Sequence, residues 1–160
     1  MSELVVIGYE DEDAARNAYA EVQELHRQFV VQLSGLAIIT VDTEGRSHVD
    51  TPGRIVGASA ASGAMFGMLF GLLFLSPAIG ALIGGAMGAL VGQLNKTGVN
   101  NSFRDQVREI LTPGHTVVVI MATKITDDKF AAAMRPFGGQ ILHTSLSADD
   151  ERELAGQMSA

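Results

Sequence analysis

A stretch of forty-one residues without a charged side chain, residues 55–95, constrains this chain more than any other feature. Within it, glycine recurs at every fourth position in two rows. The rows are Gly63, Gly67 and Gly71, followed by Gly80, Gly84, Gly88 and Gly92. Residues four apart lie on one face of a helix, so these glycines let two helix backbones approach closely. The pattern predicts an apolar two-helix hairpin whose helices pack through their glycines, a glycine zipper.

The hairpin is expected to turn at Ser76 and Pro77, with Ser76 as the N-cap and Pro77 at the first position of the second helix. The two helices would have about 20 and 18 residues, or about 30 and 27 Å at 1.5 Å per residue, long enough to cross a hydrocarbon core. Arg54 precedes the hairpin, and Lys96 and then Arg104 follow it. Positive charge at both ends places those ends in the cytoplasm by the positive-inside rule.

The helices are only moderately apolar, because glycine and serine dilute their leucines and phenylalanines. Each helix would gain only a few kcal/mol from insertion, at roughly 0.3 to 0.6 kcal/mol for each large apolar residue. We therefore expect homo-oligomers in which the zipper faces meet, with Phe66, Phe70 and Leu73 pointing toward lipid or neighbouring subunits. The alternative is a soluble protein whose hairpin is buried by its own domain or by symmetric copies of the chain, enclosing lipid.

The rest of the chain is acidic, with 18 Asp and Glu against 11 Lys and Arg and a net charge of -7. Nucleic acid is therefore not an expected partner, since phosphate would be repelled. There is no cysteine, which excludes disulfides, thiolate metal ligands and a cysteine nucleophile. Residues 1–7 do not resemble a signal peptide. We expect a cell-membrane protein with its polar domain and both termini in the cytoplasm.

Alternation, capping residues and turn residues predict strands and helices on both sides of the hairpin. Strands are expected at 4–9, 35–41, 47–50, 115–122 and 140–146; helices are expected after Asp11, after Asn101 or Ser102, and after Thr126. Without the hairpin, the first six elements have the β-α-β-β-α-β order of a ferredoxin-like, split βαβ sandwich, plus one α-β unit. We therefore expect an α+β domain formed by residues 1–54 and 96–146, the inserted hairpin 55–95, and an acidic helix or tail 147–160 with a capping box at Ser147 and Asp150.

No group of side chains has the spacing of a catalytic, metal or cofactor site. His26, His48, His115 and His143 lie far apart and pair with no other ligand on one helix face. His48 and Asp50 share one face of a strand, which is typical of solvated strand ends. The glycines near Gly84 and Gly85 match neither a dinucleotide fingerprint nor a phosphate-binding loop. We expect no catalytic residue, no metal and no cofactor, and hence no enzyme.

The opening strand Val5–Tyr9 with the acids and alanines of residues 11–15, the strand end at residues 48–51 and the central glycine hairpin together resemble an uncharacterised bacterial family of predicted membrane proteins. This family is the domain of unknown function twelve-sixty-nine. The resemblance covers nearly the whole chain and implies a membrane-associated bacterial protein. It implies no reaction, cofactor or catalytic residue.

The leading hypothesis is a non-enzymatic, homo-oligomeric membrane protein that acts as a scaffold, a pore-like assembly or a membrane-stress factor, with lipid and copies of itself as partners. One alternative is the soluble oligomer that encloses its hairpins and carries lipid. Another is a ligand-sensing regulatory module, by analogy with ferredoxin-like sensors.

Overall fold

The structure, a computed structural model, describes residues 2–44, 46–50, 66, 96–150 and 152. The predicted glycine rows, the predicted turn at Ser76 and Pro77, and Arg54 lie outside the described residues. Within them, the chain forms an α+β domain with one five-stranded antiparallel sheet. Its elements are β1 (Ser2–Tyr9), α1 (Glu12–Arg27), β2 (Val31–Val41), β3 (Ser47–Asp50), α5 (Asn101–Ile110), β4 (Thr116–Ile125), α6 (Asp127–Met134), the 3-10 helix η1 (Arg135–Phe137) and β5 (Gln140–Leu146).

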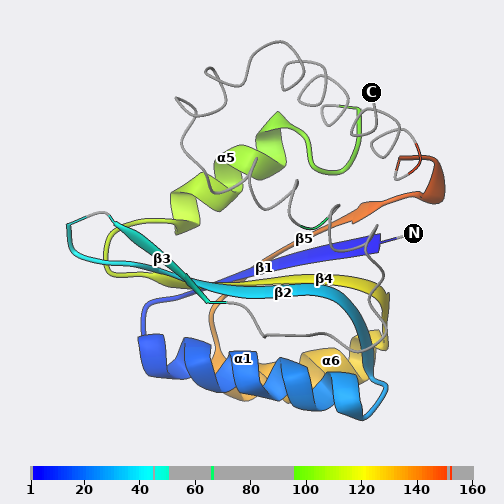
Figure 1. The fold of residues 1–160 in the computed structure, drawn as a ribbon, viewed down its shortest axis with the longest axis horizontal. Helices are drawn as coiled ribbons and strands as arrows, with labels where there is room; N and C mark the ends of the chain where they lie inside the picture. The colour runs from blue at the N-terminus through cyan, green and yellow to red at the C-terminus, as the bar shows by residue number, and fades with distance from the viewer. Residues whose placement is uncertain (1, 45, 51–65, 67–95, 151, 153–160) are drawn as a thin grey trace.

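The sheet has the strand order β3-β2-β4-β1-β5, and every neighbouring pair is antiparallel (Figure 1). β4 is the central strand. Its apolar run from Thr116 to Ile120 is buried, as its sequence predicted, because neighbouring strands and both helical layers cover it. β1 pairs with β4 through Val6 and Val119, and β2 pairs with it through Ile39 and Val117.

Helices cover both faces of the sheet. Side chains alternate along β1, so Val5 and Ile7 lie in one apolar cluster and Leu4 and Val6 in the other. The first cluster contains the buried stripe of α1 and the apolar side chains of α6; the second contains the apolar side chains of α5. In Figure 1, α1 and α6 accordingly lie on one side of the sheet and α5 on the other.

This layering changes the role that the sequence suggested for the helix at 101–110. The predicted order made that helix the second helix of the split βαβ sandwich and treated the last helix and strand as an addition. In the structure, α6 shares the face of α1, and β5 pairs with β1 as an edge strand of the same sheet. The order of elements along the chain does not specify the face on which each helix packs.

Two of the three helices begin at the N-cap residue that the sequence predicted, and the third begins one residue earlier. Asp11 caps α1 as predicted, its Oδ1 accepting a hydrogen bond from the Asp13 N–H at 3.0 Å. Asn100, and not Asn101 or Ser102, caps α5 by accepting from the Phe103 N–H at 3.0 Å. Thr126 is the N-cap residue of α6, as predicted, although its side chain makes no capping hydrogen bond.

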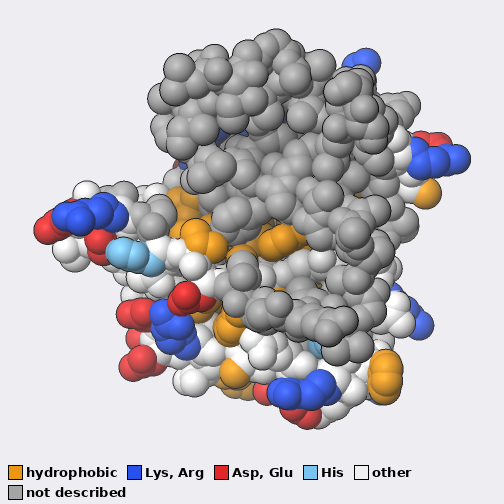
Figure 2. All heavy atoms as spheres, viewed as in Figure 1, with side chains coloured by type: hydrophobic (Ala, Val, Ile, Leu, Met, Phe, Trp, Pro, Cys, Tyr) orange, Lys and Arg blue, Asp and Glu red, His pale blue; other side chains and the backbone are white. Residues whose placement is uncertain are grey.

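The predicted capping box at the start of the acidic C-terminal segment is present. The Ser147 N–H donates to Asp150 Oδ2, and the Asp150 N–H donates to Ser147 Oγ, each at 3.1 Å. Elsewhere, charged side chains gather over α1 and the β2–β3 turn on the face drawn in Figure 2, and hydrophobic side chains show between them over the sheet.

Candidate functional site: the attachment of the apolar segment

The chain leaves and re-enters the described domain at opposite edges of the sheet. Asp50 ends β3, one edge strand, and its Oδ2 pairs with Nη2 of Arg16 on α1 at 3.4 Å. Gly98, before α5, packs against the other edge strand, β5, and its carbonyl accepts a hydrogen bond from Thr144 Oγ1 at 2.8 Å. Five strands spaced about 4.8 Å apart make the sheet between these edges roughly 19 Å wide. Residues 51–95 therefore connect two edges of one sheet.

The returning chain is packed closely against β5. A Cβ atom at Gly98 would lie 2.2 Å from Thr144 Oγ1 and 2.5 Å from the Ser145 carbonyl oxygen, so only glycine fits there. The next residue, Val99, is fully buried in the cluster on the α5 face, and its N–H donates to Thr97 Oγ1 at 3.1 Å. These contacts fix the point at which the apolar segment ends.

Phe66, from the apolar segment, lies directly over Gly35 of β2. A Cβ atom at Gly35 would be 2.2 Å from both Cγ and Cδ2 of the Phe66 ring. Phe66 is half-buried and packs against the apolar cluster on the α5 face. The prediction that this ring points toward lipid or a neighbouring subunit is therefore wrong, because the glycine leaves room for the ring on the domain's own sheet.

The sequence signal for this contact is a glycine inside a strand. Glycine weakens a strand interior and often marks a position where another group approaches the backbone closely. Gly35 stands inside the apolar run of β2, where its missing side chain admits the aromatic ring.

The two cations on the C-terminal side of the segment differ in exposure. Lys96 is exposed. Arg104 is only 5% exposed, so it is not a surface charge beside the segment. Burial is the main cause that lowers the pKa of its guanidinium, and the nearby Arg108 lowers it further.

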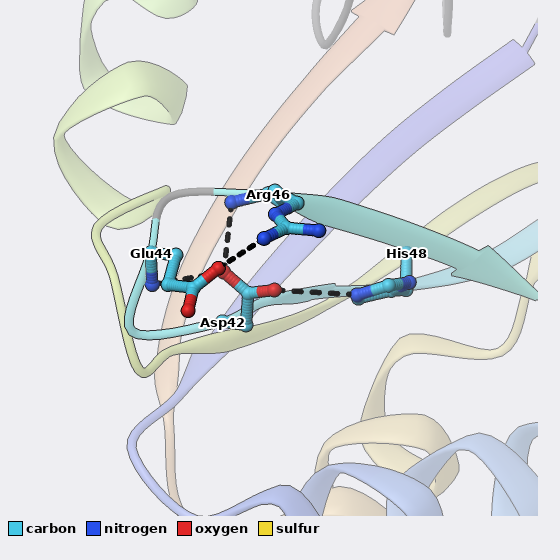
Figure 3. A network of polar contacts seen from close by, with 4 residues as sticks. All are labelled: Asp42, Glu44, Arg46 and His48. Atoms are coloured by element: carbon cyan, nitrogen blue, oxygen red, sulfur yellow. Dashed lines mark hydrogen bonds and ion pairs between the residues drawn. The ribbon is translucent and has the colours of Figure 1, made fainter.

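His48 and Asp50 do not form a joint site. His48 Nε2 lies 3.4 Å from Asp42 Oδ2, whereas Asp50 faces Arg16. The polar contacts at the β2–β3 turn instead centre on Asp42, whose Oδ1 accepts from the N–H groups of Glu44 and Arg46 at 2.9 Å each (Figure 3).

These contacts set the ionisation of Asp42. The hydrogen bond from the Arg46 backbone is the largest cause that lowers the pKa of this carboxyl, and His48 adds to it. Arg46 also pairs with Glu44 across the turn. The network fixes a hairpin turn, since its acceptor is engaged by the chain's own backbone.

The remaining histidines have separate local partners. His26 Nδ1 lies 3.2 Å from the Val31 carbonyl oxygen, His115 Nδ1 lies 2.6 Å from Thr112 Oγ1, and His143 Nε2 lies 3.7 Å from Glu3 Oε1. In the described part of the chain, no three His, Asp or Glu side chains converge on a point that could hold a metal ion. Among the helices that the structure describes, none is both long enough and apolar enough to cross a bilayer.

These features define a class of protein: an α+β domain with one antiparallel sheet, interrupted by a long uncharged segment that joins opposite sheet edges. The chain belongs to the family described as Protein of unknown function (DUF1269), whose profile matches residues 60–159, more than half of the chain. The matched region contains both predicted glycine rows and the elements α5 to β5, and it confirms the resemblance found in the sequence. No curated protein and no solved structure matches the chain.

Proposed function

We propose that this chain is a non-enzymatic, homo-oligomeric, membrane-associated protein whose segment 55–95 anchors the α+β domain on the cytoplasmic side of the cell membrane. The observation that carries the proposal is the forty-one-residue run without charge, which contains two rows of regularly spaced glycines. Exposed Lys96 at its end agrees with a flanking cation. Such an assembly would serve as a scaffold, a pore-like structure or a membrane-stress factor.

We further propose that the domain has ferredoxin-like topology, with units different from those read along the sequence. β1 and β2 both run antiparallel to β4, so they are parallel to each other with β4 between them and α1 connecting them. β4 and β5 are likewise parallel, with β1 between them and α6 connecting them. These are two interleaved split βαβ units. On this interpretation the insertion includes β3 and α5 as well as residues 51–95.

Membrane residence is tested by fractionating cells and treating the membranes with carbonate and then with detergent. The proposal expects the protein in the carbonate-resistant membrane fraction and in solution only after detergent is added. Protease mapping of the tip near Ser76 would then show whether that tip is exposed on the far side of the membrane. A protein that remains in the high-speed supernatant without detergent would refute the anchor.

The zipper is tested separately, by replacing Gly67 and Gly84 with leucine and measuring size in detergent. Leucine on a packed glycine row separates the helices, so the oligomer should dissociate. Gly85→Leu is the matched control, because Gly85 neighbours Gly84 but lies outside both rows. An unchanged size, or the same loss in the control, would contradict assembly through the glycine rows.

A second candidate function is favoured by one contact. Because Phe66 rests on Gly35 of its own domain, the apolar segment has at least one docking point on the sheet. This contact supports the alternative of a soluble oligomer that encloses its apolar segments and carries lipid. That alternative predicts supernatant protein with extractable lipid. It also predicts that Phe66→Ala moves the protein toward the membrane fraction, whereas for an inserted anchor the same change leaves the distribution unaltered.

The ligand-sensing module remains a third proposal, based on analogy with ferredoxin-like sensors. Saturable thermal shifts across a panel of metabolites would support it, and their absence would count against it.

A further inference from the structure

The two edge strands of the sheet differ in how they are protected against pairing with another chain. Proteins usually protect an edge strand by making it short or by placing charged residues or proline on it. β3 has only four residues and ends at Asp50, which is paired with Arg16. β5 has seven residues and lies beside β1 at the opposite edge (Figure 1). Its sequence, QILHTSL, contains no Asp, Glu, Lys, Arg or Pro, so β5 has none of these protections.

The first half of β5 is the part that remains open. Among the described residues, only β1 pairs with β5, and no backbone hydrogen bond outside that pairing reaches residues 140–146. The chain that returns from the apolar segment packs through Gly98 against Thr144 and Ser145, in the second half of the strand. In the first half, three of the four residues 140–143 are exposed. These four residues are called the β5 edge below.

An exposed apolar side chain on the β5 edge provides an independent observation. Ile141 is 53% exposed, although its register partner on β1, Ile7, is fully buried. Ile7 belongs to the apolar cluster beneath α1 and α6, so Ile141 continues that apolar face beyond the part that the two helices cover. A further strand at this edge would cover Ile141 and extend the same face.

The distribution of charge indicates which strand would be added. The chain has a net charge of -7, so two copies repel each other over most of their surfaces. β5 carries no carboxylate, and the carboxylate of Glu3 beside it faces His143, with 3.7 Å between Oε1 and Nε2. Two β5 strands can therefore meet without like charges opposite each other. Two identical strands related by a two-fold axis are also self-complementary, whereas an uncharged strand has no charge that would select a different partner.

We propose that the β5 edge is a self-association surface, at which two copies of this chain pair antiparallel through residues 140–143 and join their sheets. Such pairing gives the open backbone groups of each copy their hydrogen-bond partners. The contact goes beyond the proposed function, because it lies on the α+β domain and requires neither the glycine rows nor a membrane.

Disulfide cross-linking of the full-length protein tests the contact, because the chain has no cysteine of its own. At the two-fold axis one residue lies opposite its own copy, with Cα atoms about 4.5 to 5.5 Å apart, which suits a disulfide. Each residue away from the axis adds about 6.6 Å along the strands and places the thiols out of reach. Single cysteines at positions 140, 141, 142 and 143 should therefore give cross-linked dimer with a sharp maximum at one position.

Val49→Cys is the matched control, because Val49 is 47% exposed on the other edge strand, β3. Its yield of cross-linked dimer should be at most about a tenth of the maximum, since the two thiols then lie far outside disulfide reach. Equal yields at all four positions of β5 would indicate random collision and overturn the proposal. A maximum no higher than the yield of Val49→Cys would overturn it as well.

A charge placed on the edge provides a second test. Ile141→Lys, combined with the cysteine of highest yield, should lower that yield about tenfold, because it removes apolar contact and sets like charges against each other. Where the maximum falls at position 141, His143→Lys takes its place. Val49→Lys should leave the yield unchanged. An unchanged yield with the lysine on β5 would contradict pairing through this edge. The cross-link is read identically in the membrane fraction and in the supernatant, so failure of this proposal is distinguishable from failure of the membrane anchor.

Discussion

Replacing Gly35 and Phe66 together should destabilise the protein less than the sum of the two single replacements. Gly35→Ala introduces a methyl group 2.2 Å from two ring carbons of Phe66, so the ring must move. Overpacking of this kind costs about 1 to 3 kcal/mol. The better strand propensity of alanine returns part of it, which leaves a net cost of roughly 1 kcal/mol.

Phe66→Ala removes the ring itself. A fully buried phenylalanine loses about 3 to 5 kcal/mol on truncation to alanine, and Phe66 is half-buried, so roughly 2 kcal/mol is expected. Without the ring, the new methyl group at position 35 meets no steric conflict and fills part of the vacated space. The double variant should therefore lose only about 1 kcal/mol, against about 3 kcal/mol for additive effects.

Urea denaturation of the wild type, the two single variants and the double variant, in one buffer or one detergent, measures this coupling, and thermal melting of the same four proteins checks it. At about 2 to 4 °C per kcal/mol for a chain of this size, the double variant should melt about 2 to 4 °C below the wild type, and additive effects would give about 6 to 12 °C. Phe29→Ala is the control, since Phe29 is 80% exposed and alanine keeps a Cβ atom on the same left-handed backbone, so stability should change by less than about 0.5 kcal/mol. If the losses of the two single variants add up to that of the double variant within about 0.5 kcal/mol, Phe66 does not rest on Gly35. The soluble alternative would then lose the contact that supports it.

Three further predictions concern the domain alone. Phe29 has a left-handed backbone with φ of 62°, so Phe29→Gly should raise the melting temperature, by about 1 to 4 °C, in a calorimetric scan; a decrease would contradict the strain. Folding lowers the pKa of Asp42, so its ionised form stabilises the protein at pH values above the ordinary pKa of 3.8. In acid denaturation, the stability advantage of the wild type over Asp42→Asn should therefore vanish as pH falls through the lowered pKa. The pKa of Tyr9 is raised from 10.0 to about 12, so the stability of the wild type relative to Tyr9→Phe should decline between pH 10 and 12 in urea titrations, and an unchanged difference would show that the hydroxyl ionises equally in both states.

Local sequence signals located the elements of the domain well because each depends on neighbouring residues. The alternation of β1, the apolar run of β4 and the turn before β5 predicted their strands within a few residues. The Asp11 cap and the capping box at Ser147 were found because the donor and acceptor lie within three residues of each other.

The contacts of the candidate site were harder to predict, because each joins residues far apart in the chain. Gly35 and Phe66 are 31 positions apart in the chain, and Gly98 and Thr144 are 46 positions apart. The burial of Arg104 was also hard to predict, since arginine side chains usually lie at the surface. No local pattern encodes which partner such residues find.

The sequence by itself determined the α+β class, the positions of most strands and helices, and the uncharged segment with its spaced glycines, because periodicity and capping act over a few residues. Only the tertiary structure decided that α5 covers the face of the sheet opposite α1 and α6, and that the segment connects two sheet edges. Those features arise from long-range packing, in which apolar faces compete for the same sheet and the lowest free energy of the whole chain selects the arrangement.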